Sequence, residues 1–192
     1  MLMFVTGLVL FFGMHSISIV TPGWRERFVA RKGELPFRYA YSIISVAGFL
    51  LIALGYDHIR QYLEPVVLYS PPIWLRHLSL LLMLPVFVLM IAAYLPGSIQ
   101  RAAKHPMLLA VKLWALAHLL ANGTLADVLL FGSFLAWAVA DRISLKRRVA
   151  PTVPSLPVSP WNDWIALGAG FGLYVAFVLW LHLALIGVSP MA

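Results

Sequence analysis

The feature that most constrains this chain is a series of six long apolar stretches, with most charged residues confined to the connectors between them. A helix needs about 20 mostly apolar residues to cross a bilayer. The chain has 192 residues, of which 62% are hydrophobic and 11% charged, more apolar surface than a soluble fold of this size could bury. The sequence therefore predicts an all-α integral membrane bundle of six transmembrane helices, over residues 2–20, 39–56, 74–95, 106–121, 125–141 and 163–188.

Turn-forming residues mark the connectors between these stretches. Asn122-Gly123-Thr124 separates the fourth stretch from the fifth and predicts a tight helical hairpin, with Thr124 capping the second helix. Residues 151–160 carry four prolines and no charge, which predicts an extended cytoplasmic linker. No internal repeat is evident, so we expect a single membrane domain over residues 1–192.

Basic residues set the expected orientation. The second connector holds only Arg60 and Arg76, and the fourth holds none. Lys and Arg favour the cytoplasmic side, so the odd connectors are predicted to be cytoplasmic and both termini periplasmic. The first stretch has no basic region before it, unlike a cleavable signal peptide, and is therefore expected to stay in the protein as a membrane helix. The net charge of +7 thus reflects membrane topology and not nucleic-acid binding. Eleven basic residues lie in the odd connectors: Arg25, Arg27, Arg31, Lys32, Arg38, Arg101, Lys104, Arg142, Lys146, Arg147 and Arg148.

Several chemistries are excluded by missing residues. The chain has no cysteine, which excludes disulfides, iron–sulfur clusters, thiolate haem ligation and a cysteine nucleophile. No carboxylate pair has a spacing suited to hydrolysis, and the chain has no phosphate loop, nucleophile elbow or HExxH helix. The remaining signals are ionisable residues inside the apolar stretches.

His15 and His118 lie between apolar neighbours on two different stretches. Ionisable residues within the membrane are costly and mark sites or partners. Two neutral imidazoles from separate helices can ligate the iron of haem b from opposite sides. The alternative is that each histidine hydrogen-bonds a neighbouring helix.

Depth in the membrane complicates this pair. At the helical rise, His15 and His118 are separated by roughly 10–15 Å along the membrane normal. By depth in the membrane, His105 is closer to His15, and His77 is closer to His118. A His15–His105 pair and a His77–His118 pair therefore both stay open. His105 and His118 cannot share one iron, because about 20 Å of continuous helix separates them.

Other polar residues have simpler interpretations. Lys112 either extends to the cytoplasmic interface or meets an anion such as a haem propionate. Asp127 is expected to complement the positive N-terminus of its helix. His58 lies in a polar connector and His182 near a helix end, so neither is expected to form part of a site.

One block carries a family resemblance. The run from His105-Pro106-Met107 through 112–123 to Ala126-Asp127 resembles the core of the NnrU family. The match extends over nearly the whole chain. Further matching segments are 131–134, Asp141-Arg142, Gly13-Met14-His15-Ser16, Tyr41-Ser42 and Gly48.

The resemblance implies a multi-pass protein of the bacterial inner membrane, associated by name with nitrite and nitric oxide reduction, with respiratory reductase components as partners. The family is similar to the plastid 15-cis-zeta-carotene isomerase, which uses haem b with histidine ligands to isomerise a lipophilic polyene. His15 and His118 match its ligand positions, and a haem b here would draw on His15, His118, His77, His105 and Lys112. The isomerase has a cysteine three residues before the second histidine, where this chain has Ala115, so the resemblance is weakest for a ligand switch and for isomerase activity.

Two alternatives remain. The chain could be a haem-free accessory protein for the assembly of a respiratory reductase. Lys104-His105-Pro106-Met107 is also similar to the Arg-His-Pro motif with which isoprenylcysteine and related membrane methyltransferases bind S-adenosylmethionine. Here lysine replaces arginine and the downstream acidic pair is missing. The sequence assigns no catalytic residue.

Overall fold

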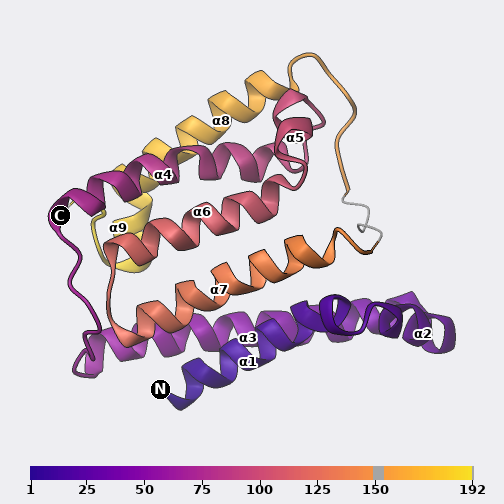
Figure 1. The fold of residues 1–192 in the computed structure, drawn as a ribbon, viewed down its shortest axis with the longest axis horizontal. Coiled ribbons are helices and arrows are strands. Elements are labelled where there is room, and N and C mark those ends of the chain that lie inside the picture. The colour runs from indigo at the N-terminus through magenta and orange to yellow at the C-terminus, as the bar shows by residue number, and fades with distance from the viewer. Residues whose placement is uncertain (149–153, 192) are drawn as a thin grey trace. The chain divides into compact units, whose positions relative to one another are not determined.

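The computed structural model describes residues 1–148 and 154–191, and its regular structure in those ranges is helical (Figure 1). The one β-type contact recorded there is an isolated antiparallel bridge between Val67 and Thr124. The all-α prediction is therefore confirmed for the described residues. The elements are α1 (Leu2–Val20), α2 (Pro22–Lys32), α3 (Glu34–Tyr62), α4 (Ile73–Ala92), α5 (Ser98–Ala103), α6 (Pro106–Ala121), α7 (Leu125–Ser144), α8 (Asn162–Ala176), the π-helix η1 (Phe177–Leu181) and α9 (His182–Ile186).

Each predicted stretch contains a helix, but the bounds differ in places. α1 and α6 begin and end where the sequence predicts. α3 has 29 residues and extends past the predicted stretch at both ends. The short helices α2 and α5 were not predicted. Of the predicted linker, residues 151–153 lie outside the described residues, and 154–159 form no helix.

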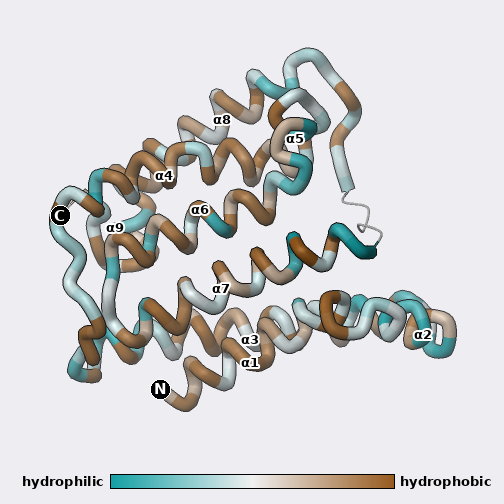
Figure 2. Tube along the Cα trace, in the orientation of Figure 1, coloured by the Kyte–Doolittle hydropathy of each residue, from teal (hydrophilic) through white to brown (hydrophobic). Residues whose placement is uncertain are grey.

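Four runs in the described part of the chain are long and apolar enough to cross a membrane: α1, α3, α4 and the continuous run Asn162–Ile186. Figure 2 shows hydrophobic residues along them and hydrophilic residues in α2. α6 has only 16 residues, a length of about 24 Å, which is shorter than a typical hydrocarbon core. α7 contains Asp127, Asp141 and Arg142 near its ends. The structure thus agrees with a helical membrane bundle, whereas six crossings and periplasmic termini stay predictions.

The chain divides into two compact units. Unit 1 comprises Met1–Leu68 and Thr124–Val149, and unit 2 comprises Tyr69–Gly123 and Ala150–Ala192. Unit 1 contains α1, α2, α3 and α7, and unit 2 contains the other helices. The division describes contacts within the chain, and a single membrane domain over 1–192 stays a prediction.

In unit 1, α1 packs along α3 through glycines. A Cβ atom added at Gly55 would lie 2.6 Å from the backbone nitrogen of Phe4, and one added at Gly48 would lie 2.8 Å from that of Phe11. Phe4 itself is fully buried. Small residues allow this approach, which membrane helices need because lipid gives them no hydrophobic driving force to associate.

In unit 2, α4 packs against both α6 and α8 (Figure 1). Asn162, at the start of α8, is buried, and its side-chain amide donates to the carbonyls of Pro96 (2.9 Å) and Pro157 (3.1 Å). The next residue, Asp163, accepts from the backbone N–H groups of Ser98 (2.8 Å) and Ile99 (3.1 Å). These bonds fix the start of α8 against α5 and the end of α4.

The predicted turn at 122–124 is confirmed, since only these three residues separate α6 from α7. Thr124 caps α7 as expected and forms a reciprocal capping box with Asp127. In unit 1, the backbone N–H of Leu125 also donates to the carbonyl of Val66 at 2.8 Å. In unit 2, the N–H of Tyr69 donates to the carbonyl of Gly123 at 3.2 Å. The turn is therefore hydrogen-bonded to the second connector.

Candidate functional site: the histidine pocket of unit 2

Unit 2 contains a cavity of about 380 Å³, which we call the histidine pocket. This volume is within the range of roughly 300–1,000 Å³ typical of small-molecule sites. Three stretches of the unit contribute side chains: one face of α4, the C-terminal end of α6, and the run from α8 to the C-terminal residues. The lining residues are Arg76, Ser79, Leu80, Met83, Phe87, Ala117, His118, Ala121, Asn122, Tyr174, Phe177, Val178, His182, Val188, Ser189 and Pro190.

The pocket changes from polar to apolar along α4. Arg76 lies in the first turn of the helix, whereas Met83 and Phe87 lie further along the same lining face. Arg76 and Phe87 are about 16 Å apart along the helix axis at the standard rise. The ring of Phe87 packs against that of Phe177, with centroids 5.1 Å apart. The pocket therefore suits a ligand with one polar end and an apolar body.

His118 enters the pocket from α6 in a fixed orientation. Its Nδ1 lies 2.8 Å from the backbone carbonyl of Trp114, one turn earlier. A carbonyl oxygen can only accept, so Nδ1 carries the hydrogen and the lone pair of the neutral imidazole is on Nε2. The indole of Trp114 also contacts the imidazole, with ring centroids 5.2 Å apart. Local helix geometry thus sets which nitrogen can bind a ligand.

His182 enters the same pocket at the start of α9. Its Nδ1 lies 2.6 Å from the carbonyl of Val188, which again assigns the lone pair to Nε2. The rings of His118 and His182 have centroids 6.5 Å apart and planes inclined by 22°. The sequence interpretation did not expect His182 to form part of a site, whereas the structure places it in the lining of this pocket. Depth in the membrane was the signal that could have found His182, because His118 lies near the C-terminal end of α6 and His182 near the C-terminal end of the continuous run Asn162–Ile186.

In unit 1, His15 lies within a group of aromatic side chains. Its ring stacks on Phe11 at 4.1 Å and contacts Tyr41 at 5.3 Å and Trp137 at 5.8 Å. Its Nδ1 lies 2.8 Å from the carbonyl of Phe11, the same one-turn contact that His118 makes. The indole nitrogen of Trp137 is buried without a hydrogen-bond partner. Because Nδ1 of His15 donates to the carbonyl of Phe11, the lone pair of its neutral imidazole is on Nε2, as in His118.

The predicted site residues are distributed over both units. His15 belongs to unit 1 and His118 to unit 2, so their pairing on one iron stays a prediction. His77 is exposed on α4, His105 caps the far end of α6, and Lys112 is half-buried in α6. None of these three is among the residues that line the histidine pocket. Across 1–148 and 154–191, no group of three or more His, Cys, Asp or Glu side chains could hold a metal.

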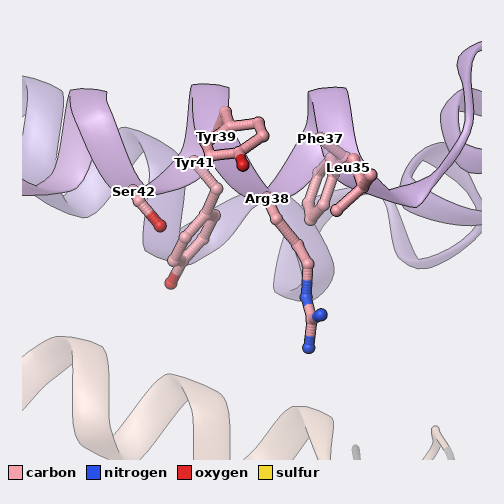
Figure 3. Close-up of a pocket in the computed structure, with 6 residues that line it drawn as sticks. All are labelled: Leu35, Phe37, Arg38, Tyr39, Tyr41 and Ser42. Atoms are coloured by element: carbon pink, nitrogen blue, oxygen red, sulfur yellow. The ribbon is translucent and has the colours of Figure 1, made fainter.

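A second, open hollow of about 480 Å³ lies at the start of α3 in unit 1. Figure 3 shows the Arg38 guanidinium and the Tyr41 hydroxyl projecting to the same side of the helix. Arg38 also pairs with Glu34 at 3.7 Å. The hollow reaches the His15 group through Tyr41. Its lining residues are Leu35, Phe37, Arg38, Tyr39, Tyr41 and Ser42.

Comparison with known protein families shows to which family this chain belongs. A family model described as NnrU protein matches residues 3–190. The chain belongs to the NnrU family. The match includes His15, His118 and His182, and it confirms the resemblance found in the 105–127 block. Comparisons with curated proteins and with solved structures gave no match.

Proposed function

We propose that this NnrU protein binds haem b in the membrane, with His118 and His15 as iron ligands. The observation that supports the proposal is the shared geometry of the two histidines. Each Nδ1 lies 2.8 Å from the carbonyl four residues earlier, and each ring contacts the aromatic side chain of that residue. Histidines that bind metals typically make such a hydrogen bond through their other nitrogen, because it fixes the ring and raises its basicity.

The residues around His118 fit a haem. Neutral imidazole is a common ligand of haem iron. Arg76 lines the same pocket and is a cation suited to a propionate. Phe87 and Phe177 form an apolar wall that would exclude water from a macrocycle. A bound haem would supply a redox-active iron, while these residues would orient it and hold its charge.

A redox-linked role in the bacterial inner membrane follows from this proposal. The haem would support either nitrite and nitric oxide reduction or the isomerisation of a lipophilic polyene such as zeta-carotene. The apolar lining of the histidine pocket favours a lipophilic substrate. Ala115 is fully buried and provides no thiolate, so the proposed ligation relies on imidazole and not on exchange with a cysteine.

The absorption spectrum of the purified protein tests the proposal. After expression with ample haem, we expect a Soret band that shifts when dithionite is added. The His118→Ala and His15→Ala variants should each weaken or lose this band, because an iron ligand is removed. His58→Ala is the matched control, since His58 is exposed, lies outside the pocket lining and is not expected to form part of a site, and it should keep the wild-type spectrum.

Helical content and elution as a single species in detergent show whether each variant is folded. A folded wild-type protein that stays colourless with ample haem would contradict haem binding. That result would favour the haem-free accessory role in reductase assembly. Retention of labelled S-adenosylmethionine by the colourless protein would instead favour a methyltransferase.

A further inference from the structure

We propose that the hollow at the start of α3 binds the phosphate headgroup of an anionic phospholipid, whose acyl chain lies along an exposed apolar face of the same helix. The site belongs to unit 1 and shares no residue with the histidine pocket, so the proposal does not depend on haem. It rests on a cation with surplus charge, on the hydroxyl groups beside it, and on the apolar face that continues from the hollow.

The helices around the hollow indicate that it lies at a membrane surface. α2 connects α1 to α3, and both of those helices are long and apolar enough to cross a membrane. Five of the 11 residues of α2 are charged, so this helix belongs outside the hydrocarbon core. Trp24 and Phe28 of α2 pack on Phe37 of α3, with ring centroids 6.3 and 5.9 Å apart. Tryptophan and tyrosine are enriched at the headgroup level, which also suits Tyr39 and Tyr41 of the hollow.

Positive charge dominates this connector. Residues 21–38 hold five basic side chains and two acidic ones, which leaves a net charge of +3. Arg25 and Arg38 share one carboxylate, that of Glu34, at 3.5 and 3.7 Å. Glu34 approaches Arg38 through its Nε, and the side chain of Arg38 is 69% exposed. Because one carboxylate cannot neutralise two guanidinium groups, a second anion is favoured beside Arg38.

The hollow offers donors that suit a phosphate. Figure 3 shows the Arg38 guanidinium and the Tyr41 hydroxyl on the same side of α3, and Ser42 follows directly in the lining. A guanidinium and hydroxyl groups donate to phosphate oxygens. None of the six lining residues is acidic. Asp141 of α7 acts electrostatically on Tyr41, but its carboxylate is already paired with Arg148.

An exposed apolar face of α3 continues from the hollow. Leu35 and Tyr39 line the hollow, and Ile43, Val46 and Leu50 follow at intervals of three or four residues. These five side chains are 51–67% exposed and share one face of the helix. From Tyr39 to Leu50 this apolar face runs about 16 Å, which is about half of a hydrocarbon core. One acyl chain covers the same depth, so a lipid can place its headgroup in the hollow and its chain on this face.

The test reconstitutes the full chain in phosphatidylcholine vesicles with chain-labelled phosphatidylglycerol or chain-labelled phosphatidylcholine. Electron paramagnetic resonance measures the fraction of each spin label that the protein immobilises, which gives the relative affinity of the two lipids. The vesicles are kept in about 1 M salt, where the Debye length is about 3 Å, so that diffuse attraction to the basic connector is screened. We expect the wild type to immobilise phosphatidylglycerol in preference to phosphatidylcholine.

Two substitutions should change this preference in opposite directions. Arg38→Gln should reduce it roughly threefold or more, because the main donor to the phosphate is removed. Glu34→Gln should increase it, because the carboxylate that competes for Arg38 is removed. Arg31→Gln is the matched control, since it removes the same charge from an exposed position on α2 that does not line the hollow. This control should keep the wild-type preference.

Three outcomes would overturn the proposal. The first is a wild type without preference for phosphatidylglycerol. The second is an equal loss in Arg38→Gln and Arg31→Gln, which would assign the preference to the charge of the whole connector. The third is displacement of the labelled lipid by excess inorganic phosphate, which would assign the hollow to a soluble phosphate. We expect the lipid to stay bound, because a soluble ion makes no contact with the apolar face.

Discussion

Asp127 is a buried carboxylate near the start of α7, and its partners lie within unit 1. It is 6% exposed. The Tyr56 hydroxyl donates to its Oδ1 at 2.5 Å, and the backbone N–H and hydroxyl of Thr124 donate to its Oδ2 at 2.9 and 2.7 Å. The sequence interpretation of Asp127 as a structural residue at the helix N-terminus is confirmed by this capping box. The contact with Tyr56 links α7 to α3 and was not predictable from local sequence.

Removing this carboxylate should destabilise the protein. Asp127→Ala leaves the Tyr56 hydroxyl and the backbone N–H and hydroxyl of Thr124 without this acceptor, and we expect a loss of about 1–3 kcal/mol in the free energy of unfolding. Denaturant titration in detergent, followed by helical content, measures it. Asp57→Ala is the control, because Asp57 is exposed and bonds only the side chain of Gln61 one turn away in the contacts recorded. Equal effects of the two variants would contradict the structural role of Asp127.

At the scale of elements, glycines set how closely the helices pack. A Cβ atom at Gly170 of α8 would lie 2.6 Å from the Cα of Val88 on α4, whereas one at Gly172 would meet nothing within 4 Å. Gly170→Ala should therefore force α4 and α8 apart and cost about 1–3 kcal/mol. Gly172→Ala should be neutral or stabilising by up to about 1 kcal/mol, because alanine favours the helix. Thermal unfolding of both variants in one detergent measures the difference, and two shifts of the same sign would contradict the packing.

Helix bounds and side-chain contacts could be predicted from the sequence where they depend on residues close by in the chain. Pro106 begins α6 and Asn122 follows its end, so both bounds could be predicted. α3 runs past its apolar stretch because backbone hydrogen bonds continue while polar side chains such as Asp57 are exposed, which hydropathy does not detect. The carbonyl bonded to His118 is one turn away on the same helix. The carbonyl bonded to His182 depends on a chain reversal after α9, so this residue was missed.

At the scale of the whole molecule, the hydrogen bonds of the second connector bear on how many helices cross the membrane. In unit 1, Val66 accepts from the N–H of Leu125, and Val67 forms a bridge with Thr124. In unit 2, the Tyr69 hydroxyl donates to the carbonyls of Leu119 and of Asn122, the latter at 2.8 Å. The turn between α6 and α7 should therefore lie on the same side of the membrane as the second connector. With α4 crossing the membrane, this arrangement predicts that α6 crosses as well, despite its short length, and the six-helix prediction has α7 crossing back.

The absence of cysteine allows a direct test, because each introduced thiol is the only one in the chain. Leu125→Cys reports on the turn, Glu64→Cys on the second connector and Ala30→Cys on the basic first connector. We expect a membrane-impermeant maleimide to label the first two variants in intact spheroplasts, and Ala30→Cys only after permeabilisation, since basic connectors favour the cytoplasm. Leu125→Cys keeps the backbone bond to Val66, so the turn should be preserved. Labelling of Leu125→Cys together with Ala30→Cys would place the turn in the cytoplasm. In that case α6 and α7 would not cross, and only the four long apolar runs of the described chain would span the membrane.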